Sequence, residues 1–341
     1  MLALLVLAQW SVVAWVASAA HHSGWLYGDP AETQRLHEAS RAILHGHLSQ
    51  NGGGFLWPVL TAPFAAVGAS PSAGLAALVL VQVVVLLPLA LLSLVGAAAC
   101  LAGRTLGAFA GAVWIVLPLL GYRFFDVRMR PAVRDGFLPA QLGLAETTLF
   151  PTMVALAVAG YLLVRALGSG SAWGAASAGL AASVALALSG SALVFVPGLL
   201  CALALRRRPL PIGAAACALL PGLVAFGLWH AHAPAAEAPL LHFDWSQFHG
   251  NLLGFREYGW SLRVVEWVPI AGTIALLRRS LTAAVGVASW FWLGVLLRGA
   301  VPDTFATGDP FHPSSAFLTL LLPAFPAFVL LVAALPLLVP R

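Results

Sequence analysis

The first side chains able to do chemistry lie in residues 27–48, directly after an apolar opening segment. Asp29 is a good N-cap, Pro30 suits the first helical position, and Glu32 follows three residues after the cap, as in a capping box. Apolar residues then recur at helical spacing, with charged residues and histidine opposite them. The pattern predicts a short amphipathic helix lying on a membrane surface, with an acidic residue at its head.

A second group of reactive side chains lies in residues 122–146 and contains four arginines within twelve residues. A guanidinium group can hold a phosphate in bidentate fashion, but two aspartates lie among the arginines, so a solvated loop of ion pairs fits the pattern equally well. The charged residues of this group are Arg123, Asp126, Arg128, Arg130, Arg134 and Asp135.

Two glutamates, Glu146 and Glu266, lie just inside apolar stretches. An acid within a membrane segment is a functional candidate by default. The structural alternative is that either glutamate pairs with an arginine such as Arg263.

Later loops add aromatic residues and histidines. Residues 242–263 are dense in aromatic side chains, including Tyr258, which could stack on a sugar or anchor the chain at the membrane interface. His312 lies with Asp303 and Asp309 in a further loop. We expect this loop to close over a cavity that it shares with the other loops.

The histidines raise the question of a metal. The pairs at 21–22 and at 230 and 232 offer nitrogen ligands, and Asp29 could add an oxygen. Neither spacing is a recognised site pattern, so we predict no metal site and leave a divalent cation as an open alternative. The three cysteines have no metal-ligand spacing and indicate neither disulfides nor a redox site.

The composition defines the class of protein. The chain has 341 residues, of which 61% are hydrophobic and 9% charged, and its mean hydropathy is +0.93. Such a chain is a polytopic membrane protein. All of its basic residues other than histidine are arginine, and we expect them to set membrane orientation and to contact phosphate, not to bind nucleic acid.

We predict a single all-α membrane domain over residues 1–341, with about ten transmembrane helices and the amphipathic helix after the first of them. We expect the opening segment, residues 1–20, to be retained as a helix although its end resembles a signal-peptidase site. A proline-rich element at 55–67 is too short to cross. The expected spans are 2–20, 73–102, 106–121, 147–164, 173–190, 191–205, 211–229, 264–277, 281–297 and 316–338.

The connections fall into two sets. One set is short and carries arginine without acids, which places it on the cytoplasmic side by the positive-inside rule. The longer set then faces outward, and all twelve acids and all ten histidines lie on or near this outer face. This sidedness predicts a shared outer-face site in the cell membrane, built from the loops 21–56, 122–146, 230–263 and 298–315.

The order of several short motifs resembles the GT-C superfamily of membrane glycosyltransferases, in particular protein O-mannosyltransferases and aminoarabinose transferases. An acid, an amphipathic helix and a glycine follow the first helix (29–46), and an aromatic and proline-rich element follows at 56–64. A helix pair joined around Arg104 comes next, then Leu144-Ala-Glu146-Thr leading into a helix, and an LPAFPAF stretch opens the last helix. The family's adjacent acid pair is replaced here by Asp29 followed by proline.

The resemblance implies an inverting transfer of a sugar from a polyprenyl-phosphate donor to an acceptor that is a protein, a glycan or a lipid. Asp29 would then be the base that takes the acceptor's proton, Glu32 would orient it, and the four arginines of 122–146 would hold the donor phosphate. Two other classes stay open: a catalytically inactive lipid-binding or assembly protein of the same fold, and a transporter or flippase for an anionic lipid.

Overall fold

The computed structural model describes residues 1–22, 27, 30–48, 54–67, 71–232, 243–258, 264–301 and 314–339. Within these ranges the secondary structure is helical, and the only extended pairing is an isolated parallel bridge between Tyr27 and Ala145. The prediction of an all-α membrane protein is confirmed at this level.

Six helical segments of the described chain are long and apolar enough to cross a membrane. All six fall where apolar runs predict them. They are α1 (Leu2–Ala19), the continuous run of α4 (Pro71–Val81), the π-helical η1 (Gln82–Leu86) and α5 (Leu87–Ala102), then α6 (Arg104–Phe124), α9 (Leu149–Ser169), α12 (Pro209–His232) and α15 (Leu281–Gly299).

The four other predicted spans are helical, but each is either too short for a full crossing or interrupted by a turn, so the expected count of about ten is supported only for six. Prolines contribute to this, because each lacks an N–H and the chain tightens into 3₁₀ turns beside several of them. These segments are α10 (Ala172–Leu188), η3 (Gly190–Phe195) with α11 (Val196–Ala204), α14 (Val264–Arg279), and the series α16 (Ala316–Leu320), η4 (Leu322–Ala324), α17 (Phe325–Ala334) and η5 (Leu335–Leu338).

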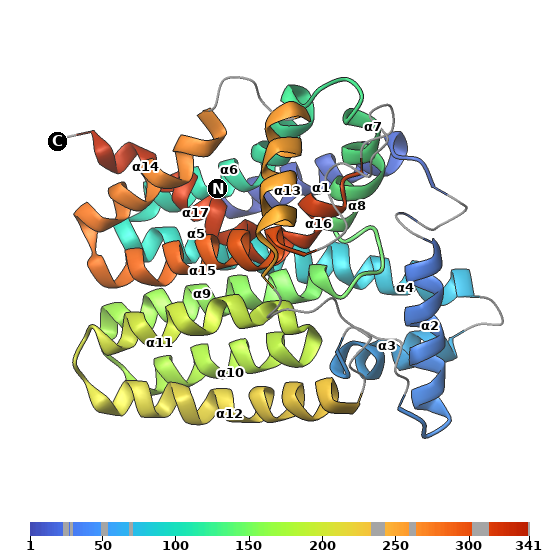
Figure 1. Ribbon diagram of the computed structural model, residues 1–341, viewed down its shortest axis with the longest axis horizontal. Helices are drawn as coiled ribbons and strands as arrows, with labels where there is room; N and C mark the ends of the chain where they lie inside the picture. The colour runs from blue at the N-terminus through green and yellow to red at the C-terminus, as the bar shows by residue number, and fades with distance from the viewer. Residues whose placement is uncertain are drawn as a thin grey trace.

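The helix ends gather at two opposite ends of the bundle. At one end, Arg279 Nε donates to the carbonyl of Leu101 at 3.1 Å, and Arg278 Nη1 donates to that of Leu338 at 3.0 Å. This arginine end therefore joins the ends of α14, α5 and η5. Figure 1 shows the helices running side by side from this end toward α2 and α3 on the right.

The helix α9 forms the centre of the bundle. In its most apolar 18-residue stretch, 67% of the residues are buried, against 17% for α1. The helix packs against α5, α10, α15 and α17. Gly160 allows the Trp290 ring to approach, because a Cβ there would lie 3.0 Å from Cζ3 of the indole. The same indole donates Nε1–H to the carbonyl of Pro323 at 3.0 Å. Of the six candidate spans, α9 is therefore the one with the largest buried share.

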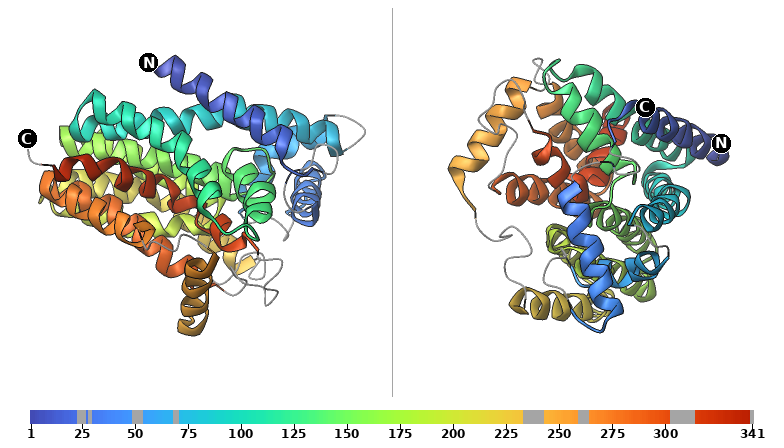
Figure 2. Two further views of the ribbon diagram at one scale, coloured as in Figure 1. Left: turned by 90° about the horizontal axis from the view of Figure 1, so that it is seen from above. Right: turned by 90° about the vertical axis from the view of Figure 1, so that its right-hand side faces the viewer.

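The predicted amphipathic helix is present as α2 (Pro30–Leu44) and crosses the right-hand end of the bundle (Figures 1 and 2). Its apolar face is covered by protein: Leu36 packs with Trp57 of α3 (Leu56–Ala66), with Leu78 and with Leu188. A hydrogen bond of 2.6 Å between the hydroxyls of Ser40 and Thr61 joins α2 to α3. The prediction was that the apolar face of α2 lies on the membrane surface. In the structure, the buried part of this face packs on neighbouring helices instead.

Candidate functional site

The longer connections meet at the end of the bundle opposite the arginine end. The backbone N–H of His21 donates to Asp135 Oδ1 at 2.8 Å, which ties the end of α1 to the second loop. The N–H of Asp126 donates to the carbonyl of Tyr258 at 2.8 Å, which ties the second loop to α13 (Trp245–Tyr258). We call this region the loop end. It brings together residues that lie far apart in the sequence.

Glu146 lies in a buried turn that enters α9 from the loop end. The turn begins after the short helix α8 (Leu138–Gln141), where Gly143 adopts a left-handed conformation (φ 73°) and the N–H of Leu144 donates to the carbonyl of Pro139 at 2.8 Å. The bridge from Tyr27 to Ala145 then brings the first loop beside it. These contacts hold Glu146 at 6% exposure.

The carboxyl group of Glu146 is in an unusual environment. Its Oε2 atom is buried and accepts no hydrogen bond from any described residue. Burial, and secondarily the negative charge of Glu32 in the first turn of α2, raise the pKa of Glu146 to about 8. A carboxyl with this pKa exchanges its proton near neutral pH, which is a property of a general base or acid and not of a surface carboxylate.

A small pocket beside Glu146 separates it from α2. Its walls come from His37 and Ser40 of α2, Thr61 and Phe64 of α3, and residues 74–78 of α4. The space holds about one water molecule. Burial and the nearby Arg41 lower the pKa of His37, while Glu38 opposes them, so this imidazole is neutral at pH 7. The pocket thus places two proton-exchanging groups around one small polar space.

The four arginines predicted to bind phosphate lie at the loop end, and the side chains of three of them are engaged. Arg134 makes a bidentate pair with Asp135 at 2.8 and 2.9 Å. Arg128 pairs with Asp126 at 3.0 Å and lies 5.1 Å from the centre of the Tyr258 ring. Arg130 donates to the carbonyls of Phe125 and Arg123, and Arg123 itself is exposed.

These pairs favour the alternative of a loop stabilised by ion pairs, at least for Arg128 and Arg134. The guanidinium of Arg134 and the His21 N–H lower the pKa of Asp135, and the Arg128 backbone and side chain lower that of Asp126. Both carboxylates are therefore charged at neutral pH. A donor phosphate that used these arginines would have to compete with an adjacent aspartate.

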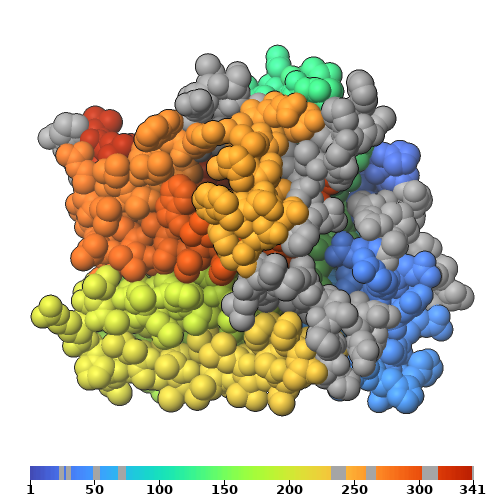
Figure 3. Space-filling model, viewed as in Figure 1, coloured from blue at the N-terminus to red at the C-terminus, as the bar shows by residue number. Residues whose placement is uncertain are grey.

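The third loop contributes a packed tyrosine and an exposed aromatic group. Tyr258 is only 2% exposed, so it serves as the platform under Arg128 and is not an open sugar-stacking surface. Trp245 and Phe248 lie with their ring centres 5.6 Å apart on α13, which covers part of the surface of the bundle in Figure 3. Glu266 is paired with Arg256, at 2.5 and 3.1 Å, which is the structural alternative with a different arginine from the example of Arg263.

Several predicted site residues lie outside the described ranges. These are Asp29, Arg263, Asp303, Asp309 and His312. Glu32 is described and half-buried, and it has interactions of its own. Among the residues that the structure describes, no three histidine, cysteine, aspartate or glutamate side chains are grouped for a metal ion.

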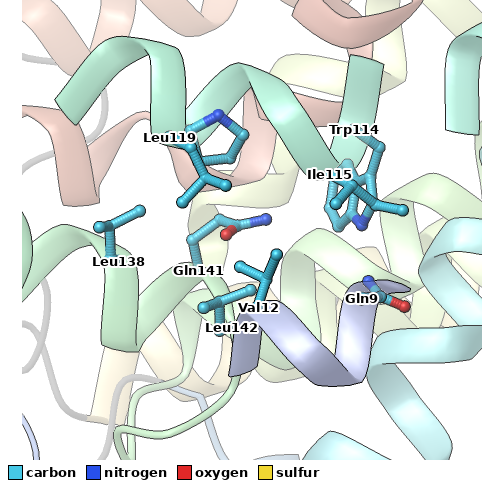
Figure 4. Close-up of a pocket in the computed structure, with 9 residues that line it drawn as sticks. Gln9, Val12, Trp114, Ile115, Leu119, Leu138, Gln141 and Leu142 are labelled. Atoms are coloured by element: carbon cyan, nitrogen blue, oxygen red, sulfur yellow. The ribbon is translucent and has the colours of Figure 1, made fainter. Parts of the chain in front are cut away.

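Sequence reasoning overlooked a set of buried glutamines. Gln9, Gln82 and Gln141 are each at most 1% exposed, and no described residue bonds to either amide atom of Gln9 or Gln82 or to Oε1 of Gln141. Figure 4 shows Gln9 and Gln141 around a cavity between α1, α6 and α8. The signal was available, because a glutamine within an apolar run is unusual.

A buried arginine was overlooked as well. Arg298, in the last turn of α15, is 7% exposed. Beside it, Asn251 Nδ2 of α13 donates to the carbonyl of Gly299 at 2.6 Å. The sequence placed this residue at the start of a loop, where exposure was the natural expectation.

Comparison of the chain with protein-family models, with curated proteins and with solved structures finds no match. Functional inference therefore rests on the geometry of the loop end.

Proposed function

We propose that this protein is a membrane glycosyltransferase that moves a sugar from a polyprenyl-phosphate donor to an acceptor hydroxyl, with Glu146 as the general base. The observation that carries the proposal is the buried Glu146 carboxyl, with an Oε2 atom that no described residue bonds and a pKa raised to about 8. A base needs a pKa near the working pH and a free oxygen directed at the proton. Glu146 has both.

The surroundings of this base support the proposed reaction class. Inverting transfer requires one group to take the proton of the acceptor hydroxyl while cations stabilise the departing phosphate. The loop end combines Glu146 with a group of arginines, and it lies at the end of a bundle whose apolar spans would hold a lipid chain. This combination supports a lipid-linked phosphate donor and an acceptor that approaches from the aqueous side.

The orientation is part of the proposal. The acid-free connections carry arginines, which by the positive-inside rule favour the cytoplasmic side for the arginine end. The loop end would then face outward from the cell membrane, where a lipid-linked sugar serves as donor in place of a soluble nucleotide sugar. Asp29 remains a prediction as a second acid of this site.

The test is transfer from a labelled donor in membranes. Vesicles containing the protein are supplied with radiolabelled polyprenyl-phosphate hexoses and pentoses, and loss of label from the lipid fraction is followed. Replacing Glu146 with Gln keeps the shape and removes the base, so transfer should fall by about 10²- to 10⁴-fold.

The matched control is Glu38→Gln. Glu38 lies on the exposed side of α2, where its carboxylate accepts a hydrogen bond from Gln34 at 2.9 Å, and its loss should leave transfer unchanged. Wild-type transfer by the Glu146→Gln protein would refute the assignment of the base.

One observation favours a second candidate function. Arg128 and Arg134 are already paired with aspartates, which fits an inactive relative that binds lipid or supports an assembly. In that case the wild-type protein would bind polyprenyl phosphate and leave every labelled sugar on its carrier.

A further inference from the structure

We infer that His37 relays the proton between Glu146 and the solvent through the single water-sized space that separates them. This inference rests on the proposed role of Glu146 and adds a second residue to it. A base buried to 6% exposure has to return its proton to water after each turnover, and the structure offers a route through the pocket that Glu146 shares with α2.

The walls of the pocket leave few alternatives for the route. The described residues lining it include two titratable ones, Glu146 and His37. The helices α3 and α4, which form the other walls, contain no titratable residue. On α2 the charged neighbours of His37 are Glu38 and Arg41, and Glu32 acts on Glu146 from the first turn.

The two hydroxyls in the pocket act as acceptors. Ser40 Oγ donates to the carbonyl of Leu36 at 2.9 Å, Thr61 Oγ1 donates to that of Trp57 at 2.9 Å, and the two oxygens lie 2.6 Å apart. With the carbonyl of Pro58, 3.4 Å from Thr61 Oγ1, the two hydroxyl protons face four possible bonds, and none is left for a water. The hydroxyl lone pairs can orient a water, whereas the imidazole nitrogen can take its proton.

The proton balance is simple. Glu146 receives the proton of the acceptor hydroxyl as the new glycosidic bond forms and the phosphate leaves with the former bonding electrons. The carboxylic acid then gives this proton to the bound water, which passes one of its own to the neutral imidazole of His37. The imidazolium is short-lived, because burial and Arg41 disfavour it, and it releases the proton to the solvent at the half-buried surface of α2.

The experiment follows the proton without requiring the acceptor. In protein reconstituted into vesicles, the infrared band of the protonated Glu146 carboxyl, assigned by its absence in Glu146→Gln, is followed after mixing into D₂O at pH 6. His37→Ala should slow hydrogen–deuterium exchange of this band about tenfold or more, and added imidazole should restore the rate. His45→Ala, at an exposed position directly after the C-terminal end of α2, is the control and should exchange like the wild type.

Each outcome decides the inference. Unchanged exchange in His37→Ala, slowed exchange that imidazole does not restore, or no protonated Glu146 band in the wild type would overturn the relay. If His37→Ala does not fold, His37→Gln, which keeps the volume but cannot carry the proton, replaces it and should show the same slowed exchange. Loss of transfer in Glu146→Gln with normal exchange in the His37 variants would leave the proposed function standing and remove only the relay.

Discussion

At the scale of single residues, Glu146 has an environment that disfavours its charge. Burial and the nearby Glu32 both raise its pKa, to about 8. Hydrogen bonds to neighbouring arginines instead lower the pKa values of Asp126 and Asp135. The direction of the shift separates the two kinds of acid at the loop end. The carboxylates of Asp126 and Asp135, which stabilise the loops, are charged at pH 7. The carboxyl group of Glu146, which exchanges its proton, is largely neutral at this pH.

This difference predicts how stability depends on pH. Between the unfolded pKa of about 4.5 and the folded pKa of about 8, only the folded state keeps the Glu146 proton. The Glu146 contribution to the free energy of unfolding therefore falls as pH rises through this window and is constant above it.

Replacing Glu146 with Gln should remove this dependence. Each pKa unit corresponds to about 1.4 kcal/mol. The free energy of unfolding of the variant should therefore exceed that of the wild type by up to about 5 kcal/mol at pH 8 and by little at pH 4. Thermal unfolding in detergent at several pH values measures the gain. A constant difference in melting temperature across the range would contradict a buried, neutral Glu146.

At the scale of elements, the turn between α8 and α9 decides where Glu146 lies. Gly143 has a positive φ, and a Cβ added there would lie 2.7 Å from Cζ of Phe150 and 3.1 Å from Cβ of Gln82. Glycine is thus required twice at this position, for its backbone conformation and for its lack of a side chain.

Gly143→Ala should therefore shift the turn. The left-handed conformation alone costs about 1–2 kcal/mol for a residue with a Cβ, and the contact with Phe150 adds to this. We expect a lower melting temperature together with a loss of transfer activity. Gly168→Ala, in a helical part of α9 with open space around it, is the control: it should leave transfer unchanged and should not lower the melting temperature, because alanine is the better helix former.

The same scale explains why α2 is more than a surface helix. Its contact with α3 through Ser40 and Thr61 fixes the side of the pocket that faces Glu146. The amphipathic pattern identified the helix and its buried stripe. It could not distinguish a membrane surface from a neighbouring helix as the partner, because both are apolar.

At the scale of the whole molecule, the separation of the two ends is the feature on which the proposed function depends. The arginine end joins α5, α14 and η5 through Arg278 and Arg279, and the loop end gathers the described acids. If the arginine end is cytoplasmic, only the loop end meets the outside of the cell.

Cysteine labelling tests this orientation. In a variant lacking the three native cysteines, His45→Cys should react with a membrane-impermeant maleimide added to intact cells. Arg207→Cys, in the turn between α11 and α12, should react only after the cells are opened. The reverse pattern would place the loop end in the cytoplasm and exclude an outer-face transferase.

The sequence by itself determined the class of fold, the positions of six spans and the division of the chain into an arginine end and an acid-bearing end. These follow from local composition, because about twenty consecutive apolar residues are the length that a membrane-spanning helix needs. Only the tertiary structure decided which acid is buried, which arginines are paired and that His37 shares a pocket with Glu146. A pKa depends on burial and on charges brought close by folding, and no spacing along the chain reveals that the first turn of α2 lies beside the turn that enters α9.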